Sequence, residues 1–185
     1  MISEASVAQA ILDFWFSAAC RPKWFAKDAA FDADIAARFQ PAWERAAAGG
    51  FADWSHSANA ALARVVLLDQ FPRNMFRGSP KAFSSDALAL AAAQDAVARG
   101  YDRAVAPERR LFFYLPYEHS EELEAQRRGY DLCAANIDWP DALTAAARHM
   151  EIIERFGRFP HRNAVLGRVS TAAELEFLQE PNSSF

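Results

Sequence analysis

Cysteine is scarce in this 185-residue sequence, and the two present, Cys20 and Cys133, lie far apart. Neither lies in a CxxC motif or near histidines at a zinc-ligand spacing, so we expect neither a disulfide scaffold nor a structural zinc site. No stretch approaches the roughly 18 uncharged apolar residues of a membrane span. Residues 1–4 also lack a basic segment followed by an apolar run, so no signal peptide is expected. These absences favour a cytoplasmic protein with no membrane partner.

Basic charge is also in short supply, because the net charge is −4 and the isoelectric point is near 5.6. A general nucleic-acid binder usually carries a strongly basic face, so nucleic acid is not an expected partner. Glycine-rich phosphate loops of the GxGxxG and GxxxxGK[ST] types are missing, and no cofactor is expected. Net charge averages over the whole surface, however, so a local basic pocket remains compatible with it.

Alanine, in contrast, is abundant: the chain has 40 alanines and only seven glycines, a balance that favours helix. Fifteen phenylalanines and five tryptophans supply the bulk that alanine lacks, so that closely packed helices leave few gaps. No run of alternating apolar residues is long enough to indicate a strand. The sequence predicts an all-α protein of seven to nine antiparallel helices in one domain, residues 1–185.

Capping residues and prolines predict where the helices begin and end. The expected starts are Ser3, Asp28, Ser57, Ser84 or Ser85, Ser120, Thr171, and the prolines Pro107 and Pro140. Pro41 predicts a kink or a split in the second helix. We expect irregular chain over residues 71–80 and a break at residues 114–116, because each contains proline. The run at residues 60–68 is apolar on nearly all sides except at Arg64, which is typical of a central buried helix.

Arginine dominates the cations, with 17 arginines against three lysines, and two irregular segments carry it without any acid. Residues 155–168 hold four arginines and His161, and residues 70–85 hold Arg73, Arg77 and Lys81. Arginine offers a rigid fork of donors that matches carboxylate or phosphate, so one interpretation is a pocket for an anion. The alternative is structural, with arginines bonding helix carbonyls or pairing with acids such as Asp69 across the core.

The sequence Glu118-His119-Ser120 is a second candidate site, since it resembles an acid, a base and a nucleophile. Adjacent residues do not make a catalytic relay, however, and no GxSxG motif is present. A structural interpretation makes Ser120 a helix cap and Glu118 the partner of an arginine. If the protein is an enzyme, His119 or His161 is the expected general acid or base, with Glu118 as a further candidate.

Histidines could also suggest a metal site, because His149 and His161 accompany Glu118 and His119. The HExxH signature is absent, and residues 150–153 offer no second histidine on the face of His149. We therefore expect no metal and regard these histidines as hydrogen-bonded residues of a pocket wall.

Four stretches of the sequence carry a resemblance: residues 11–16 (ILDFWF), 67–78 (LLDQFPRNMFRG), 113–121 (FYLPYEHSE), and 155–163 (RFGRFPHRN) with 166–168 (LGR). In these stretches the sequence resembles a bacterial family known as domain of unknown function 924, which is placed in the TPR-like helical class. Met75 and Tyr117 stand where isoleucine and phenylalanine look usual. The resemblance implies an all-helical, TPR-like fold and carries no established activity or catalytic residue with it.

We expect the motifs at residues 67–78, 113–121 and 155–168 to converge on one pocket that binds an anionic small molecule. The expected binding residues are Asp69, Arg73, Asn74, Arg77, Glu118, His119, Arg158, His161, Arg162, Asn163 and Arg168. The alternative is a TPR-like interaction module that holds an acidic peptide or a carboxylate terminus in a groove. A third hypothesis is a structural network with the working surface elsewhere.

Overall fold

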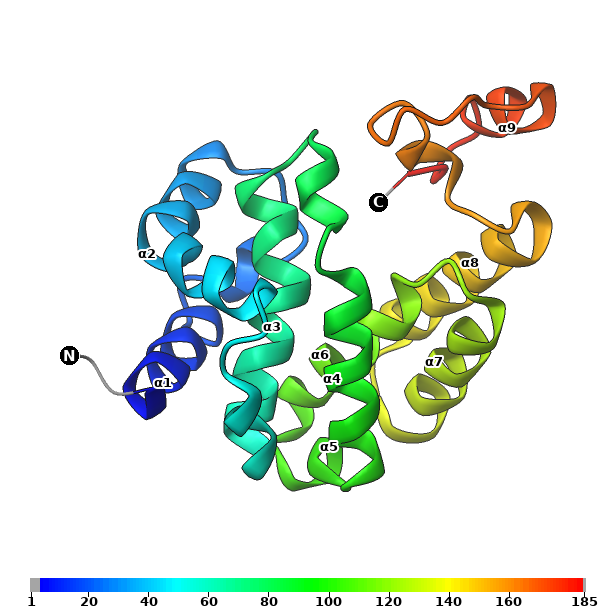
Figure 1. Cartoon of the computed structure of the whole chain (residues 1–185). Helices are drawn as coiled ribbons and strands as arrows, with labels where there is room; N and C mark the ends of the chain where they lie inside the picture. The colour runs from blue at the N-terminus through cyan, green and yellow to red at the C-terminus, as the bar shows by residue number, and fades with distance from the viewer. Residues whose placement is uncertain (1–3, 185) are drawn as a thin grey trace.

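The computed structural model describes residues 4–184, and these residues form helices without any strand (Figure 1). The nine α-helices of this part are α1 (Glu4–Trp15), α2 (Ala29–Ala47), α3 (Ala58–Met75), α4 (Asp86–Ala98), α5 (Tyr101–Ala104), α6 (Pro107–Glu118), α7 (Leu123–Asn136), α8 (Pro140–Phe156) and α9 (Ala172–Phe177). The short 3-10 helices are η1 (Arg21–Lys23), η2 (Ala52–His56), η3 (Pro80–Phe83) and η4 (Pro160–Arg162). The all-α prediction is confirmed, while the predicted cap Ser3 lies outside the described residues.

Helix α3 is the centre of the fold. Twelve of its 18 residues are buried, because α1, α2, α4 and α6 all pack against it. Figure 1 shows α3 and α4 in the middle, α1 and α2 on one side, and α7 and α8 on the other. The predicted central buried helix is therefore confirmed.

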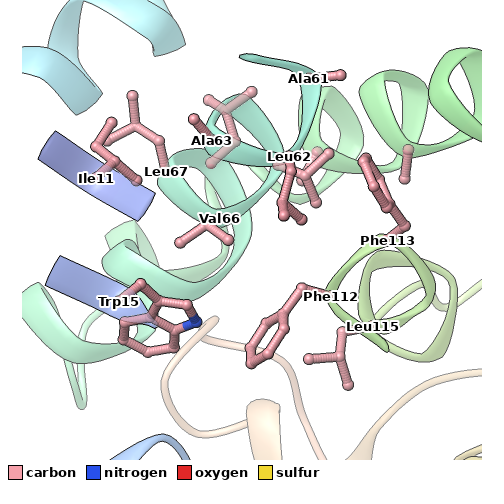
Figure 2. Packing of buried hydrophobic residues seen from close by; sticks show 14 of the residues in the cluster. Ile11, Trp15, Ala61, Leu62, Ala63, Val66, Leu67, Phe112, Phe113 and Leu115 are labelled. Atoms are coloured by element: carbon pink, nitrogen blue, oxygen red, sulfur yellow. The ribbon is translucent and has the colours of Figure 1, made fainter. Parts of the chain in front are cut away.

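Large rings and small alanines fill the core between these helices. Trp15 of α1 and Phe112 of α6 lie edge to face, with ring centroids 5.9 Å apart, and Figure 2 shows them beside Val66 of α3. Ala61 and Ala63 of α3 are both buried, and small side chains at such positions let neighbouring helices approach closely. A second, smaller cluster, made of Ile152, Ile153, Phe159 and Phe177, joins α8 to the C-terminal segment.

The expected irregular chain at residues 71–80 is wrong in its first half, because α3 continues through Pro72 to Met75. A proline inside a helix removes the hydrogen bond to the carbonyl four residues earlier, here that of Leu68. The buried hydroxyl of Ser85 donates to this carbonyl at 2.6 Å and replaces the missing bond. The helix is therefore able to carry its polar end, Asp69 to Asn74, into the interior.

Two other predicted interruptions are also absent. Helix α6 passes through Pro116 and ends at Glu118, and α2 runs unbroken through Pro41. Among the predicted caps, Asp28 and Ser57 accept backbone N–H groups of their helices. Ser120 is not the cap residue of α7, which begins at Leu123, although its hydroxyl accepts the N–H of Glu122 at 3.1 Å.

The last predicted cap is confirmed in full at α9. Thr171 accepts the N–H of Glu174 at 3.2 Å, while the Glu174 carboxylate accepts the N–H of Thr171 at 2.7 Å. Cys20 and Cys133 are both buried free thiols. No helix in residues 4–184 combines the length and apolar character that crossing a bilayer requires.

Candidate functional site

The Asp69 carboxylate and the His119 imidazole form a hydrogen-bonded pair where the ends of α3 and α6 meet. Asp69 Oδ1 lies 2.8 Å from His119 Nδ1, and Gln70 donates to the other carboxylate oxygen at 2.6 Å. Burial alone would raise the pKa of Asp69, but His119 and Arg73 outweigh it and hold this pKa at about 2. Asp69 is therefore ionised and accepts only, so Nδ1 of His119 carries a proton.

A second acid, Asp86 at the start of α4, lies between two arginines. Arg73 donates to both of its oxygens, at 2.8 and 3.0 Å, and Arg162 Nη1 lies 3.4 Å from Oδ2. Arg162 also donates from Nη2 to the carbonyl of His119 at 3.0 Å. These contacts bring the motifs at residues 67–78, 113–121 and 155–168 together at one place.

Aromatic faces hold the two guanidinium groups in position. Phe83 lies under Arg162 at 4.6 Å and near Arg73 at 5.8 Å, measured to the ring centroid. Phe159 covers Arg162 at 4.4 Å. Arg162 is therefore sandwiched between two rings, an arrangement in which cation–π attraction offsets part of its loss of water.

A half-open cavity of about 610 Å³ lies over this cluster, and we call it the α4 cavity. It is lined by Pro80, Phe83, Ser84, Asp86, Ala87, Leu90, Ala91, Gln94, His119, Ser120, Glu121, Glu122, Arg162 and Leu166. Of the predicted binding residues, only His119 and Arg162 belong to this wall. Asp69 and Arg73 lie behind it and bond to the residues that do line it.

Behind the α4 cavity lies a second buried polar group, which contains Glu118, Cys133 and His149. The Cys133 thiol donates to Glu118 Oε1 at 3.3 Å, and His149 Nδ1 lies 3.9 Å from Oε2. Burial raises the pKa of Glu118 to about 8, and burial lowers the pKa of His149 to about 3. Both groups are therefore mainly neutral at pH 7. The suggested pairing of Glu118 with an arginine is wrong, because its neighbours are a thiol and an imidazole.

The motif at residues 155–168 is held in place by two carboxylates, one on each side of it in the sequence. Glu121 accepts from Arg168 at 2.6 and 2.9 Å and from the N–H of Phe159 at 2.8 Å. Glu174 accepts from Arg158 at 2.6 and 2.8 Å. Arg158 and Arg168 thus serve to hold the segment in place.

Several predicted site residues lie away from the cavity wall. Asn74 and Arg77 bond to Asp32 of α2. Asn163 is buried and donates to Ser170 at 3.0 Å. His161 packs against the Phe159 ring at 5.6 Å, and burial lowers its pKa to about 4.

The five arginines among the predicted binding residues all have acid partners, as the structural alternative expects. Arg73, Arg77, Arg158, Arg162 and Arg168 each lie within 4 Å of a carboxylate. Asp86 is not among the predicted site residues, because it lies one residue beyond the acid-free segment 70–85. Phe83 is not among them either, and its only signal was its place among basic residues.

Metal ligands are not gathered at this place in the described part of the chain, where no group of three His, Cys, Asp or Glu side chains is arranged to hold an ion. Most of the carboxylates named above are instead paired with arginines, as Asp86, Glu121 and Glu174 are.

The sequence of residues 11–182 matches the model of a family whose description is "bacterial protein of unknown function (DUF924)". The chain belongs to this family. It is also similar to a solved structure of a protein of unknown function from Agrobacterium tumefaciens, with 44% identity and a TM-score of 0.91. That match covers 96% of this chain and 99% of the other. No curated protein matches the sequence.

Proposed function

We propose that this DUF924 protein binds a small anionic molecule in the α4 cavity. The observation that supports this proposal is the incomplete neutralisation of Arg162. Its residue is 6% exposed, its Nε–H has no hydrogen-bond partner, and it shares Asp86 with Arg73, which holds that carboxylate more closely. Burial, followed by repulsion from Arg73, lowers the pKa of Arg162 to about 10.

The other charges around the cavity leave Arg162 as the receptor for an anion. Glu121 lines the wall, but two hydrogen bonds from Arg168 balance its charge. Glu122 is exposed at the rim. A carboxylate or phosphate that enters would pair with the Arg162 guanidinium, and such a pairing is stronger in a partly dry site than in water.

Size and lining narrow the ligand further. A volume of about 610 Å³ is within the range of small-molecule sites. Phe83, Leu90 and Leu166 provide apolar wall beside Arg162. The ligand that fits best is an organic acid or phosphate ester with an apolar body.

The second candidate is an acidic peptide whose terminal carboxylate reaches Arg162, as in a TPR-like interaction module. It draws support from the half-open form of the cavity, which leaves an exit for a longer chain. A peptide with a free carboxyl terminus and its amidated form would separate the two candidates, because only the peptide hypothesis expects tight binding of the free form and weak binding of small acids.

The test is the thermal unfolding midpoint of the purified protein in phosphate or succinate, compared with chloride at matched ionic strength. A ligand at 100 times its dissociation constant adds about 2.7 kcal/mol to the free energy of unfolding, so the midpoint should rise by several degrees. Arg162→Gln should abolish the rise. Arg77→Gln should keep it, because Arg77 pairs with Asp32 away from the cavity.

A second control is needed, because Arg64 lines another cavity of about 320 Å³ and its Nε–H has no hydrogen-bond partner. Arg64→Gln should retain the phosphate response. A response that is lost in Arg64→Gln and kept in Arg162→Gln would overturn the assignment to the α4 cavity. Stabilisation by zinc or magnesium, without any response to anions, would overturn the anion proposal itself.

A further inference from the structure

His119 differs from the other histidines because it lines the α4 cavity while a buried carboxylate is hydrogen-bonded to one of its ring nitrogens. Its side chain is 14% exposed and lines the α4 cavity, whereas the Asp69 side chain is 1% exposed. Nδ1 donates to Asp69, so Nε2 holds the lone pair and lies on the far side of the ring from Asp69. In residues 4–184 no hydrogen bond occupies this Nε2.

Burial, more than the charged groups around it, keeps the imidazole of His119 neutral. Burial and the nearby Arg73 lower its pKa, although Asp69 and Asp86 act in the opposite direction. The ring of His149 is a further neighbour of His119, with 6.1 Å between the two ring centroids. A neutral imidazole with a fixed tautomer is the form in which histidine accepts a proton.

We propose that His119 is a general base for a ligand bound in the α4 cavity, with Asp69 as its positioning residue. This inference rests on the proposed function, because the reacting molecule is the one that Arg162 would anchor. Nε2 takes the proton of a water molecule or of a ligand hydroxyl group, whose oxygen then attacks the carbonyl carbon of an ester. The bond from that carbon to the alcohol oxygen breaks, and the departing oxygen takes the proton back from the imidazolium, so that His119 is neutral again. The imidazolium that forms keeps its Nδ1–H on Asp69, whose negative charge stabilises it.

The other two candidate bases do not fit this role. His161 is not part of the cavity wall. Glu118 is 2% exposed, lies behind the wall and is bonded to Cys133. The geometry thus favours His119 among the three residues that the sequence suggested.

The first test uses 4-nitrophenyl acetate, a neutral activated ester that needs no anion site. Nε2 takes a proton from water, whose oxygen attacks the carbonyl carbon, and the bond to 4-nitrophenolate breaks. The products are acetate, 4-nitrophenolate and two protons, one of them released from the imidazolium, so that neutral His119 is restored. We expect His119→Gln to lower the rate of 4-nitrophenolate release at least about tenfold. His56→Gln is the matched control, since His56 is an exposed histidine 3.8 Å from Asp53 and should leave the rate unchanged.

The role of Asp69 is tested by a spectroscopic signature and a pH profile. Nitrogen-15 NMR of the wild-type protein should show His119 as the Nδ1–H tautomer. Asp69→Asn should lower the ester rate and change both the tautomer and the pH at which the rate is half-maximal. A wild-type Nε2–H tautomer, or an unchanged rate in His119→Gln, would overturn the inference. The wild-type NMR measurement keeps the test valid even where a variant fails to fold.

The proposal of anion binding at Arg162 and the proposal of a general base at His119 can be contradicted independently of each other. Loss of the phosphate response with the His119-dependent ester rate retained would contradict only anion binding. A retained phosphate response with no His119-dependent rate would contradict only the general base.

Discussion

Glu118 shows how one residue can make the stability of the protein depend on pH. Its carboxyl group is almost fully buried against Cys133 and His149, and neither neighbour is positively charged at pH 7. The group therefore stays protonated in the folded protein, where its pKa is about 8, although it ionises near pH 4.5 in the unfolded chain. Its contribution to stability is complete below pH 4.5 and is lost as the pH rises through 8.

We predict that Glu118→Gln removes this dependence, because glutamine keeps a similar shape and never ionises. The variant should be about 2–4 kcal/mol more stable relative to wild type at pH 8 than at pH 5. Urea denaturation at the two pH values measures this difference. An equal gain or loss at both values would show that Glu118 ionises normally in the folded state.

His149 acts with the opposite sign and provides an internal comparison. Burial lowers its pKa to about 3, so its contribution is complete above about pH 6.5 and is lost as the pH falls toward 3. The wild-type protein and the Glu118→Gln variant both retain His149. The free energy of unfolding of both should therefore fall as the pH falls from 6.5 toward 3.

The sequence could name the polar residues of the site but not their partners. His119 and Arg162 were identified because their segments are basic and irregular, and both do line the cavity. The sequence does not predict Asp86 as a site residue. It lies 13 positions from Arg73 and 76 positions from Arg162, and pairing over such separations depends on how the helices pack, which no local pattern encodes. Arg77 is predicted to line the pocket but does not, because it pairs with Asp32 of α2, a helix distant in the sequence.

At the scale of the element, proline was the main source of error. Helix α3 was expected to end near Pro72 because a proline in a helix interior leaves a carbonyl without its donor. The donor comes from Ser85, which lies 17 positions from Leu68 in the sequence and is in place only once α4 has packed on α3. The helix periods and most caps, in contrast, are local, and they were predicted well.

We predict that Ser85→Ala destabilises the protein by about 2–4 kcal/mol. The change leaves the Leu68 carbonyl without its donor and the indole N–H of Trp43 without its acceptor, which Ser85 provides at 3.1 Å. Pro72→Ala should reduce this cost, because the new N–H at position 72 can bond to Leu68. A double-mutant cycle in urea measures the coupling, with the exposed Ser84→Ala as the control.

Strict additivity of Ser85→Ala and Pro72→Ala would contradict this explanation. It would show that the Leu68 carbonyl does not link the two positions.

At the scale of the molecule, charge pairs hold the C-terminal segment together with a small apolar cluster. The pair Arg158–Glu174 attaches α9 to the chain before it, and the pair Arg168–Glu121 attaches that chain to the end of α6. The hydrogen bond from Arg158 lowers the pKa of Glu174 to about 2. This attachment should be complete above the ordinary pKa of Glu174, near 4.5, and should weaken as the pH falls toward 2.

We predict that Glu174→Gln speeds amide hydrogen exchange several-fold in residues 158–178 and leaves α3 unchanged. Glutamine keeps the capping shape but loses the charge that both bonds from Arg158 require. Hydrogen exchange read by mass spectrometry tests this, with the exposed Glu176→Gln as the control. Equal exchange in the two variants would show that the pair adds nothing to the attachment.

The contact between Arg162 and Asp86, 76 positions apart, has a consequence for the order in which a newly made chain acquires its parts. Helices α1 to α4 and much of the core are synthesised first, so Arg73 and Asp86 can meet early. Arg162 and Arg168, which fixes the segment to Glu121, leave the ribosome among the last residues. A growing chain therefore has a largely formed interior well before it has a completed cavity wall, and a chain cut short before residue 162 lacks part of that wall.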